Sequence, residues 1–504
     1  MKILSAAQIR QTDQYTIASE PISSIDLMER AASACTEHIL ATYGHDRQYI
    51  IICGQGNNGG DGLAIARMLS HASCSVEVFI LDYALEGSPD FVENLARLQS
   101  IPSLFIHHIY DAVDWVIERD AKTIIIDAIL GTGINKPITG LIAQAIDRIN
   151  RSGNTVIAID MPSGLPADEP MSRPWLVVEA DLTLSFQQPK LSYMFPESGA
   201  YVGELQVLDI GWDRAYVAAM QSPYQFVQES DITPLLKQRD KFSHKGTFGH
   251  SLLIAGSYGK MGAALLASHA ALCSGTGLLT THVPGMGYPI LQTALPEAMV
   301  SIDATAEHIA ELPVLEPFTS IGIGPGIGRH DSTARALKLL IQSTPCPLVI
   351  DADALNILSE NKTWLSFLPA DTIITPHQKE FDRLTQKHNS SWERLKSAQD
   401  LAAKHNIIIV LKGTYTATVT PDRSVRFNST GNPALAKGGS GDVLTGIITA
   451  LLSRGYQPAE AAFIGVYLHG LAADIAIEDI HPESLLASDL IMHISDAWRY
   501  LYGD

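Results

Sequence analysis

The stretch YIIICGQGNNGGDGLAIARML, residues 49–69, decides the fold of the first half of this chain. Its apolar residues 50–53 are typical of a buried strand, and residues 63–69 have the apolar spacing of a helix. Five of the nine residues between them, 54–62, are glycine. The pattern predicts a strand, a tight loop and a helix whose N-terminal N–H groups can approach an anion. A glycine-rich turn without a ligand is the alternative, although two asparagines and an aspartate make the loop more particular than such a turn needs.

The composition is that of an acidic globular protein with large apolar cores. The chain has 504 residues, of which 46% are hydrophobic and 18% charged, and its formal net charge is −19. This length predicts roughly two to four domains. The negative charge argues against nucleic acid or an anionic membrane as a partner, but not against nucleotides, because helix N-termini bind phosphate in acidic proteins too.

The five cysteines are scattered and form no Cys-x-x-Cys pair. This usage favours reduced thiols in the cytoplasm over a disulfide framework or a zinc site. The N-terminal residues lack the apolar core of a signal peptide, and we expect no membrane span. We also expect a homo-oligomer, whose size the sequence does not indicate.

Two series of alternating apolar runs and helical patterns predict an α/β fold with parallel sheets and helices on both faces. The composition changes around residues 211–246, where a polar passage containing proline separates the two series. We therefore expect an N-terminal Rossmann-like three-layer αβα domain over residues 1–220 and a second αβα domain over residues 225–504. The expected strands of the two series are 50–53, 75–81, 123–126 and 155–159, then 250–256, 319–323, 347–351, 371–375 and 407–411. In the first series we expect helices near 61–71, 89–100 and 139–151.

Polar residues follow three strands of the first series, at the edge where open α/β sheets bind ligands. Asp127 follows one strand, and Asp160 and Ser163 follow the next. A buried aspartate is costly unless it is paired, so Asn58, Asp127 and Ser163 could hold a cation through oxygen atoms. Asp160 could act as a general base, although either aspartate could instead cap a turn or helix. A weaker fourth segment is Gln187-Gln188-Pro189-Lys190.

These segments resemble the NAD(P)H-hydrate epimerase family over about residues 1–215. The matching motifs are Asn57-Asn58-Gly59-Gly60-Asp61-Gly62, Asp127 with Gly131-Thr132-Gly133, and Asp160-Met161-Pro162-Ser163-Gly164. The resemblance implies that Asp160 is the acid/base at the hydroxyl-bearing ring carbon and that Asn58, Asp127 and Ser163 hold K⁺. It implies contacts to the hydrated nucleotide from Asn57, Asn58, Gly59, Gly60, Asp61, Gly131, Thr132, Gly133, Ile134, Asn135, Lys136 and Pro137. Met161 and Ala32 depart from the family pattern, at positions that carry no expected ligand.

In the second half the most specific stretch is TGNPALAKGGSGDVLTG, residues 430–446. A Gly-Ser-Gly turn before the expected helix 443–452 places backbone N–H groups at the positive end of a helix dipole. Asp442 at that turn would repel phosphate, so we expect it to take the proton of a hydroxyl that attacks phosphorus. The alternative is that Asp442 only caps the helix.

Three further segments of the second half follow expected strands. Residues 412–416 could contact a nucleotide or form a plain turn. His377 could contact the substrate, although a single histidine is more often structural. Asp351 and Asp353 could hold Mg²⁺ through water, or could simply begin a helix.

Together these segments resemble the ribokinase-like superfamily and, within it, the ADP/ATP-dependent NAD(P)H-hydrate dehydratase family, over about residues 230–500. The resemblance implies that Asp442 is catalytic and that Ala263, Gly326 and His377 contact the hydrated nucleotide. Gln378-Lys379 and Lys437 depart from the family pattern, and Lys437 is expected to lie close to the phosphates. The residues implied to contact ADP or ATP are Lys412, Gly413, Thr414, Tyr415, Thr416, Asn432, Lys437, Gly438, Gly439, Ser440 and Gly441.

The two resemblances together imply a bifunctional enzyme. Its first half would interconvert the R and S forms of hydrated NADH and NADPH, and its second half would dehydrate the S form at the expense of ADP or ATP with Mg²⁺. In the implied reaction the ring hydroxyl is phosphorylated and phosphate is then eliminated. The residues alone leave two alternatives: a kinase of a small vitamin precursor, or an N-terminal module that binds nucleotide without chemistry. A dinucleotide-dependent oxidoreductase is disfavoured, because the distal acid of the G-x-G-x-x-G pattern is missing.

Overall fold

The computed structural model describes residues 1–102, 104–111, 115, 117–171 and 175–503. They form two compact units, one of residues Lys2–Ser222 and one of Met1 with Pro223–Asp504. Each unit is an α/β structure around a largely parallel sheet, so the expected fold class is confirmed.

The N-terminal unit contains a seven-stranded sheet in the order β3-β2-β1-β4-β5-β6-β7, and all its neighbouring strands are parallel. The strand order reverses at β1, and ligand sites of open α/β sheets lie at the carboxyl ends of strands beside such a reversal. The strands are β1 (Gln48–Cys53), β2 (Ser75–Leu81), β3 (Phe105–Ile109), β4 (Thr123–Ala128), β5 (Thr155–Ile159), β6 (Leu182–Phe186) and β7 (Glu204–Leu208).

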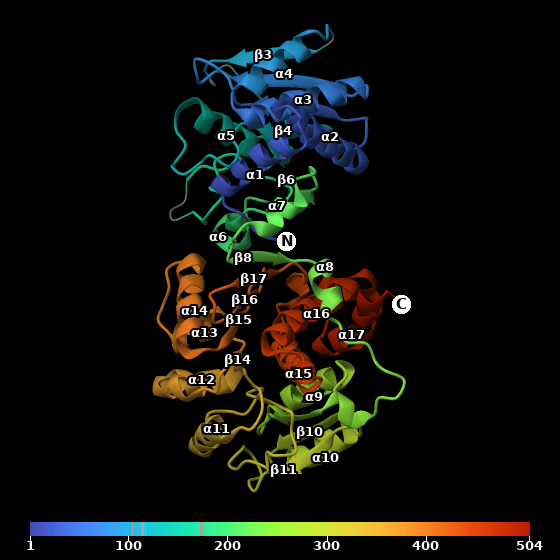
Figure 1. Cartoon of the computed structure of the whole chain (residues 1–504), viewed down its shortest axis with the longest axis vertical. Coiled ribbons are helices and arrows are strands. Elements are labelled where there is room, and N and C mark those ends of the chain that lie inside the picture. The colour runs from blue at the N-terminus through green and yellow to red at the C-terminus, as the bar shows by residue number, and fades with distance from the viewer. Residues whose placement is uncertain (103, 112–114, 116, 172–174, 504) are drawn as a thin grey trace. The chain divides into compact units, whose positions relative to one another are not determined.

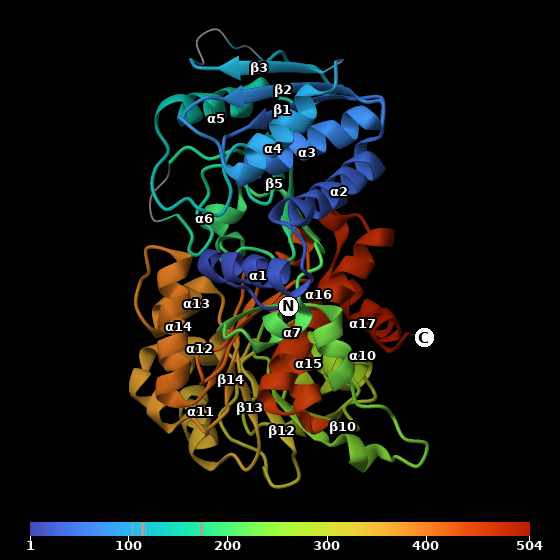
Figure 2. The same ribbon diagram turned by 45° about the horizontal axis from the view of Figure 1, so that its top comes forward.

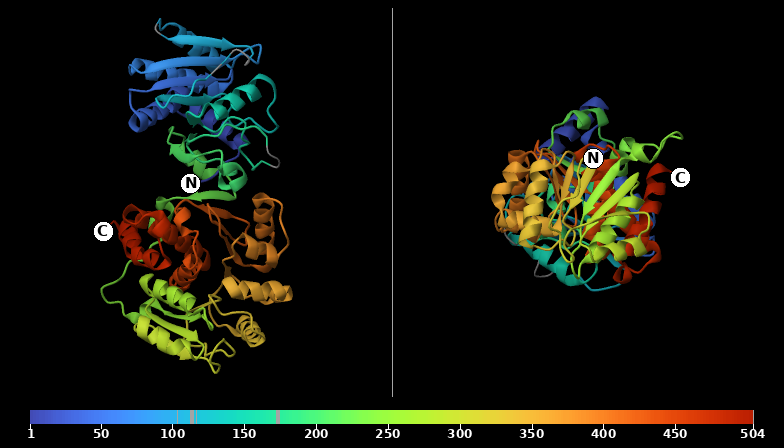
Figure 3. Two further views of the ribbon diagram at one scale, coloured as in Figure 1. Left: turned by 180° about the vertical axis from the view of Figure 1, so that it is seen from behind. Right: turned by 90° about the horizontal axis from the view of Figure 1, so that it is seen from below.

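Helices cover both faces of this sheet because successive strand residues point to opposite sides. Ile51 of β1 packs with α2, α3 and α4 on one face, and Ile50 and Ile52 pack with α5 on the other. Figure 1 shows α3 and α4 in front of the strands, and the left view of Figure 3, from behind, shows α5. The helices are α1 (Ala6–Ser19), α2 (Ser24–Tyr43), α3 (Asn57–His71), α4 (Pro89–Gln99), α5 (Gly140–Ser152), α6 (Pro196–Gly199) and α7 (Arg214–Ala219).

The glycine-rich segment differs from the expected open loop, because α3 begins at Asn57 and not near residue 61. Its glycines allow close packing of backbone on backbone. A Cβ atom on Gly59 would lie 1.8 Å from the carbonyl oxygen of Gly54, and one on Gly54 would lie 2.0 Å from that of Ile129. The glycines therefore seat the first turn of α3 against the ends of β1 and β4.

The C-terminal unit contains a ten-stranded sheet in the order β11-β10-β9-β12-β13-β14-β15-β16-β17-β8. All neighbouring strands are parallel except β15 with β16 and β16 with β17. The strands are β8 (Tyr224–Val227), β9 (His250–Ile254), β10 (Leu278–Val283), β11 (Met299–Ile302), β12 (Ser320–Ile323), β13 (Leu348–Ile350), β14 (Ile373–Ile374), β15 (Ile408–Leu411), β16 (Ala417–Val419) and β17 (Val425–Asn428).

Two groups of helices cover this second sheet, with α11 to α14 on one side and α9 and α15 to α17 on the other (Figure 1); Figure 2 shows α11 to α14 and α15 to α17 from a second direction. The second group packs its apolar residues on the strand residues Val349, Ile373 and Ile408. Helix α15 begins at Ser440, three residues before the expected Val443. The helices are α8 (Glu229–Ile232), α9 (Met261–Cys273), α10 (Gly287–Ala294), α11 (Asp331–Ser343), α12 (Ala352–Glu360), α13 (Gln378–Leu384), α14 (Ser391–His405), α15 (Ser440–Ser453), α16 (Pro458–Asp479) and α17 (Ala487–Tyr502).

Within the described residues, one helix, α16, is long and apolar enough to cross a membrane by length and composition. Of its most apolar window, 78% is buried inside the protein. Its residues Ile464, Leu468 and Ala472 belong to the largest apolar cluster of the C-terminal unit. The helix is therefore packed as the core helix of this unit.

Gly446 tests the close packing of α15 on α9, because a Cβ atom there would lie 2.1 Å from the carbonyl oxygen of Ala267. We expect Gly446→Ala to destabilise the C-terminal unit by about 1–3 kcal/mol, the usual cost of overpacking a core. The control is Gly285→Ala, whose Cβ would make only ordinary contacts at 3.5 Å. Thermal unfolding of the two variants should separate them, and equal midpoints would contradict the packing argument.

Candidate functional sites

The first polar cluster of the N-terminal unit surrounds Asp127, the fully buried residue near the end of β4. Its carboxylate accepts hydrogen bonds from the Ser163 hydroxyl at 2.6 Å, the Ser163 amide at 2.8 Å and the Ile129 amide at 3.2 Å. Burial raises the pKa of Asp127 to about 6, against the lowering effect of these bonds. The carboxylate thus ties the end of β4 to the segment that follows β5.

Asn58, in the first turn of α3, completes this cluster. Its amide Nδ2 donates to the carbonyl oxygen of Leu130 at 3.0 Å, and the Leu130 amide donates to the Ser163 hydroxyl at 2.8 Å. The Asn58 Oδ1 atom is buried and has no hydrogen-bond partner. An orphaned oxygen beside a carboxylate and a hydroxyl fits a cation with oxygen ligands. The structure therefore brings Asn58, Asp127 and Ser163 together, and the described residues contain no cluster of three His, Cys, Asp or Glu ligands.

Asp160 lies directly after β5 with a positive φ of 64°, a conformation that costs free energy in a residue other than glycine. Its Oδ1 atom lies 2.6 Å from the ammonium group of Lys190, whose side chain is only 1% exposed. The same ammonium group donates to the Ser185 hydroxyl at 3.1 Å, and the Tyr193 hydroxyl donates to the Asp160 carbonyl at 2.9 Å. These bonds hold the Asp160 side chain in a fixed position beside a positive charge. Lys190 was included in a weaker segment by the sequence analysis but was given no role. The available signal was a lysine four residues after the end of a strand, β6.

A cavity of about 320 Å³ lies beside these groups, where α1, α2, α3 and α4 meet. Asn57 and Asp61 line it, as does Phe186, whose amide donates to the Asp160 carboxylate at 3.3 Å. Gly59 and Gly60 are instead buried against Gly54 and Met28. The segment 131–137 follows β4 without regular structure and is largely exposed. It meets Asn58 through Gly131, so it lies at the cation-type cluster and not in this cavity.

The C-terminal unit has two cavities at the N-terminus of α15. One, of about 480 Å³, is lined by the expected substrate residues Ala263 and Gly326 together with Asp442. The other, of about 580 Å³, is lined by most of the expected nucleotide residues. Gly438 and Gly439 line the first cavity and Ser440 and Gly441 the second. The glycine-rich turn therefore lies where the two cavities meet, with its N–H groups at the positive end of the helix.

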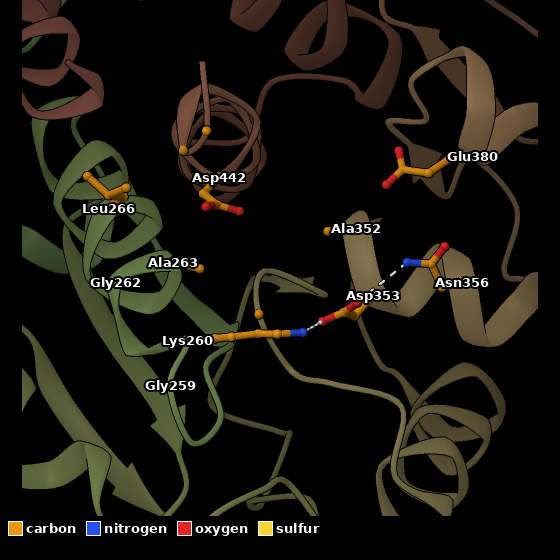
Figure 4. Close-up of a pocket in the computed structure, with 13 residues that line it drawn as sticks. Gly259, Lys260, Gly262, Ala263, Leu266, Ala352, Asp353, Asn356, Glu380 and Asp442 are labelled. Atoms are coloured by element: carbon orange, nitrogen blue, oxygen red, sulfur yellow. Dashed lines mark hydrogen bonds and ion pairs between the residues drawn. The ribbon is translucent and has the colours of Figure 1, made fainter. Parts of the chain in front are cut away.

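Asp442 lies in the first turn of α15 and points into the space between α9 and α12 (Figure 4). The N-cap of that helix is Gly439, and no side chain caps it. Burial, and then the negative charge of Asp351, raise the pKa of Asp442 to about 6. A carboxylate with such a pKa can accept a proton near neutral pH.

Two aspartate–lysine ion pairs lie near Asp442. Asp351 is buried at the start of α12 and pairs with the Lys412 ammonium group at 3.0 Å. Its other oxygen accepts from the Thr445 hydroxyl of α15 at 2.8 Å. Asp353 pairs with Lys260 at 2.9 Å across the first cavity (Figure 4). Both carboxylates that the sequence offered for Mg²⁺ thus already have lysine partners.

Some expected site residues do not line the same cavity as the other members of their group. His377 lines the second cavity with Lys412, not the first with Asp442, and its ring accepts from the Lys379 amide as the N-cap of α13. Lys437 is exposed and donates to the Glu483 carbonyl, because the turn directs it outward. Tyr415 packs edge-on against Phe226. Neither Lys437 nor Tyr415 lines the second cavity.

Sequence reasoning missed two residues of α16 that hold the second cavity together. His469 is buried, its Nε2 lies 2.9 Å from the Ser440 carbonyl, and burial lowers its pKa to about 4. Asp474 accepts from the Gly431 amide at 2.8 Å and from the Asn432 side chain at 2.9 Å. These pairs are 29 to 43 residues apart in sequence, and local motifs carry no information about such pairs.

Lys190→Met tests the buried pair with Asp160. The change leaves a carboxylate without its cation, so we expect the N-terminal unit to lose about 3–5 kcal/mol of stability. The control is Arg214→Met, which breaks the exposed pair with Asp209 and should change little, because solvent screens that pair. Denaturant unfolding of the N-terminal unit measures both, and a Lys190→Met variant as stable as the control would refute the assignment.

Comparison with known proteins gives matches over both units. The model of the NAD(P)H-hydrate dehydratase family matches residues 251–496, and that of the YjeF-related protein N-terminus matches residues 24–192. A solved structure of the ADP/ATP-dependent NAD(P)H-hydrate dehydratase from Bacillus subtilis, co-crystallised with ATP and Mg²⁺, is 34% identical. That alignment covers 55% of this chain and 98% of that chain, with a TM-score of 0.49.

Relatives named bifunctional NAD(P)H-hydrate repair enzyme match nearly the whole chain. The protein of Moorella thermoacetica is 34% identical, over 97% of this chain and 95% of that protein. The protein of Coxiella burnetii is 33% identical over 97% of each chain, and that of Escherichia coli 32% identical over 96% of this chain and 92% of that protein. The chain therefore belongs to the family of bifunctional NAD(P)H-hydrate repair enzymes.

Proposed function

We propose that this protein repairs hydrated NADH and NADPH in two steps. The N-terminal unit interconverts the R and S forms, and the C-terminal unit dehydrates the S form at the expense of ADP or ATP. Family membership over both units supports this function. The observation that carries it is that each unit holds its own carboxylate, Asp160 or Asp442, beside its own cavity.

In the N-terminal unit we assign Asp160 as the acid/base group at the hydroxyl-bearing ring carbon. Lys190 holds its carboxylate in position through the ion pair. Asn57, Asp61 and the segment 131–137 contact the nucleotide. Asn58, Asp127 and Ser163 would hold K⁺, which would supply a fixed positive charge where the Asn58 Oδ1 atom has no protein donor.

In the C-terminal unit we assign Asp442 as the base. Its carboxylate takes the proton of the ring hydroxyl as that oxygen bonds to the terminal phosphorus of ADP or ATP, and the bond from that phosphorus to the bridging oxygen breaks, which releases AMP or ADP. The N–H groups of the Gly438–Gly441 turn and the Lys412 ammonium group bind the phosphate oxygens. The ring nitrogen then expels phosphate as its lone pair forms the double bond, and loss of the adjacent C–H proton restores the dihydropyridine.

We place the hydrated nicotinamide in the cavity of Ala263 and Gly326 and the adenine nucleotide in the cavity of Lys412, Gly413, Thr414, Thr416 and Asn432. His377 lies with the second group, so we assign it to the phosphate side. Mg²⁺ would be held mainly by the nucleotide phosphates and water, because Asp351 and Asp353 are paired with lysines.

We further propose that the protein works in the cytoplasm and forms a homo-oligomer. The five cysteines are free, which supports a reducing compartment. The edge strand β3 exposes Phe105, 71% accessible, and an unpaired edge of this kind favours association. Light scattering of the purified protein tests the oligomer.

The main test supplies a mixed pool of R and S hydrated NADH with ADP or ATP and Mg²⁺. We expect the whole pool to return to NADH, with phosphate released, because the S form is drained while the R form is epimerised. Dihydronicotinamide absorbance and epimer-resolving chromatography measure the two steps. A stable phosphate ester without NADH would instead identify a kinase, and no change in either epimer would refute the function.

Asp442→Asn removes the proposed base of the C-terminal unit. We expect the dehydration rate to fall roughly 10²- to 10⁴-fold while epimerisation stays unchanged. In the unmodified protein the rate should fall as the pH drops through about 6, because protonated Asp442 cannot accept a proton. The control is Asp331→Asn, an acid in the first turn of α11 that lines neither described cavity. Equal losses in both variants would contradict the role of Asp442.

Replacing K⁺ by choline tests the cation cluster. We expect epimerisation to slow and the N-terminal unit to unfold at a lower temperature, because a cation bound only to the folded state stabilises it. Dehydration of pure S form should be less affected. Asn58→Leu should abolish the K⁺-dependent shift in unfolding temperature, and a shift that persists in that variant would place the ion elsewhere.

A further inference from the structure

A helix outside the family motifs contributes a titratable group to the N-terminal cavity. Asp13, on α1, lines this cavity together with Asp61 and Asn57. Its Oδ1 atom accepts a hydrogen bond from the indole N–H of Trp212 at 2.8 Å. Trp212 is 5% exposed, so the bond fixes the carboxyl group of Asp13 from a rigid position.

The same tryptophan connects Asp13 to the neighbourhood of Asp160. The backbone amide of Trp212 donates to the side-chain oxygen of Gln187 at 3.4 Å, and the Ile210 amide donates to the same atom at 2.9 Å. Gln187 lies three residues before Lys190, the cation paired with Asp160. A short chain of bonds therefore positions Asp13 and Asp160 relative to each other.

The charges of the cavity favour a proton on one of its carboxyl groups. Asp13, Asp61 and Asp160 influence one another electrostatically, and carboxylates that share a site cannot all ionise readily. Lys190 compensates Asp160 directly. Burial raises the pKa of Asp13 to about 6 and that of Asp61 well above its ordinary value.

Asp61 is a second sign that the cavity is built for a polar ligand. It is 8% exposed, it lines the cavity, and its side chain makes no hydrogen bond or ion pair within the part of the chain that the structure describes. A buried carboxyl without a protein partner is costly unless a ligand satisfies it.

The other charged groups near α1 already have hydrogen-bond or ion-pair partners, or are exposed at the edge of the cavity. Arg30 of α2 pairs with Glu20 at 2.7 Å, and Asp90 of α4 accepts from Ser24 at 2.6 Å. Asp213 caps α7 by accepting from the Tyr216 amide at 2.7 Å. Arg10, on α1 itself, lines the cavity and is exposed.

We propose that Asp13 is the second catalytic residue of the epimerase site, acting as a general acid opposite Asp160, with Trp212 as its positioning residue. This inference rests on the proposed function. Hydration of an enamine places the hydroxyl on the carbon bonded to the ring nitrogen, so inversion can proceed by opening that carbon–nitrogen bond.

The proton movements then balance without a further reactant. Asp160 takes the hydroxyl proton as the carbon–oxygen double bond forms and the carbon–nitrogen bond breaks. The electron pair of that bond goes to nitrogen, which receives the proton of Asp13. Closure on the other face of the aldehyde carbon reverses both transfers and yields the opposite epimer.

The test is the epimerisation rate of Asp13→Asn in the full chain, followed by chromatography from pure R hydrated NADH. The side-chain oxygen of the new asparagine can still accept the hydrogen bond from the Trp212 indole, but its amide group cannot act as a general acid. We expect kcat to fall roughly 100-fold, the common size of a general-acid contribution, with dehydration of the S form unchanged. The control is Asp168→Asn, a carboxyl that accepts from the Ala6 amide at 2.7 Å and supports α1 from outside the cavity. It should stay within twofold of the unmodified protein.

Trp212→Phe supplies an independent readout, since it leaves Asp13 in place. The hydrogen bond from the indole lowers the pKa of Asp13, so its loss should raise that pKa. Because a general acid must be protonated, the fall of the epimerisation rate at high pH should then move to higher pH. A purely structural role would lower the rate without moving the limb.

If Asp13→Asn fails to fold, the dependence of the epimerisation rate of Trp212→Phe on pH decides whether the proposal holds. An unmoved limb in Trp212→Phe, or an Asp13→Asn rate within twofold of the unmodified protein, overturns the proposal. If the unmodified protein does not epimerise at all, the proposed function fails first, which distinguishes the two outcomes.

Discussion

A carboxylate taken out of water costs free energy unless the protein supplies a partner, and this constraint organises both units of the molecule. Asp127 has the amide and hydroxyl of Ser163. Asp160 has Lys190, and Asp351 has Lys412 and Thr445. Each pair joins segments that follow different strands or helices, so these bonds hold the edge of the sheet in one arrangement.

Some carboxyl groups that line the cavities have no cationic partner. Asp442 faces one cavity, Asp13 and Asp61 face another, and burial raises the pKa of all three. The division has a physical meaning. A carboxylate paired with a lysine is held in place and serves the architecture of the sheet edge, whereas a cavity carboxyl whose pKa burial has raised toward neutrality can exchange protons, as acid–base catalysis requires.

The glycines of the first motif have a packing role that the sequence alone did not suggest. The stretch 54–62 predicted an anion-binding loop, but a side chain at Gly54 or Gly59 would collide with a backbone carbonyl. The glycines first allow α3 to start against the strands, and this start places Asn58 beside Asp127 and Ser163. In the second unit the turn before α15 lies between two cavities, as expected of a phosphate-binding turn.

The alternation of apolar runs and helical spacing predicted the α/β class and most of the parallel strands, because burial on both faces makes such strands continuously apolar. It missed short strands such as β16 and β17, whose pairing is antiparallel and whose lengths are 3 and 4 residues. It also placed the starts of α3 and α15 too late, since glycine, asparagine and serine are poor signals for a helix interior. The residues Asp160 and Asp442 were found from their neighbours in the chain, because their motifs are local.

By itself, the sequence determined the fold class, the family and the local motifs, since all three depend on residues close together in the chain. Only the tertiary structure decided which carboxyl groups are paired and which line a cavity without a cationic partner. It brought Lys190 to Asp160, His469 to Ser440, and Trp212 to Asp13 across 199 residues. Desolvation and charge act through space, so the chemistry of each carboxylate depends on neighbours that the order of residues does not reveal.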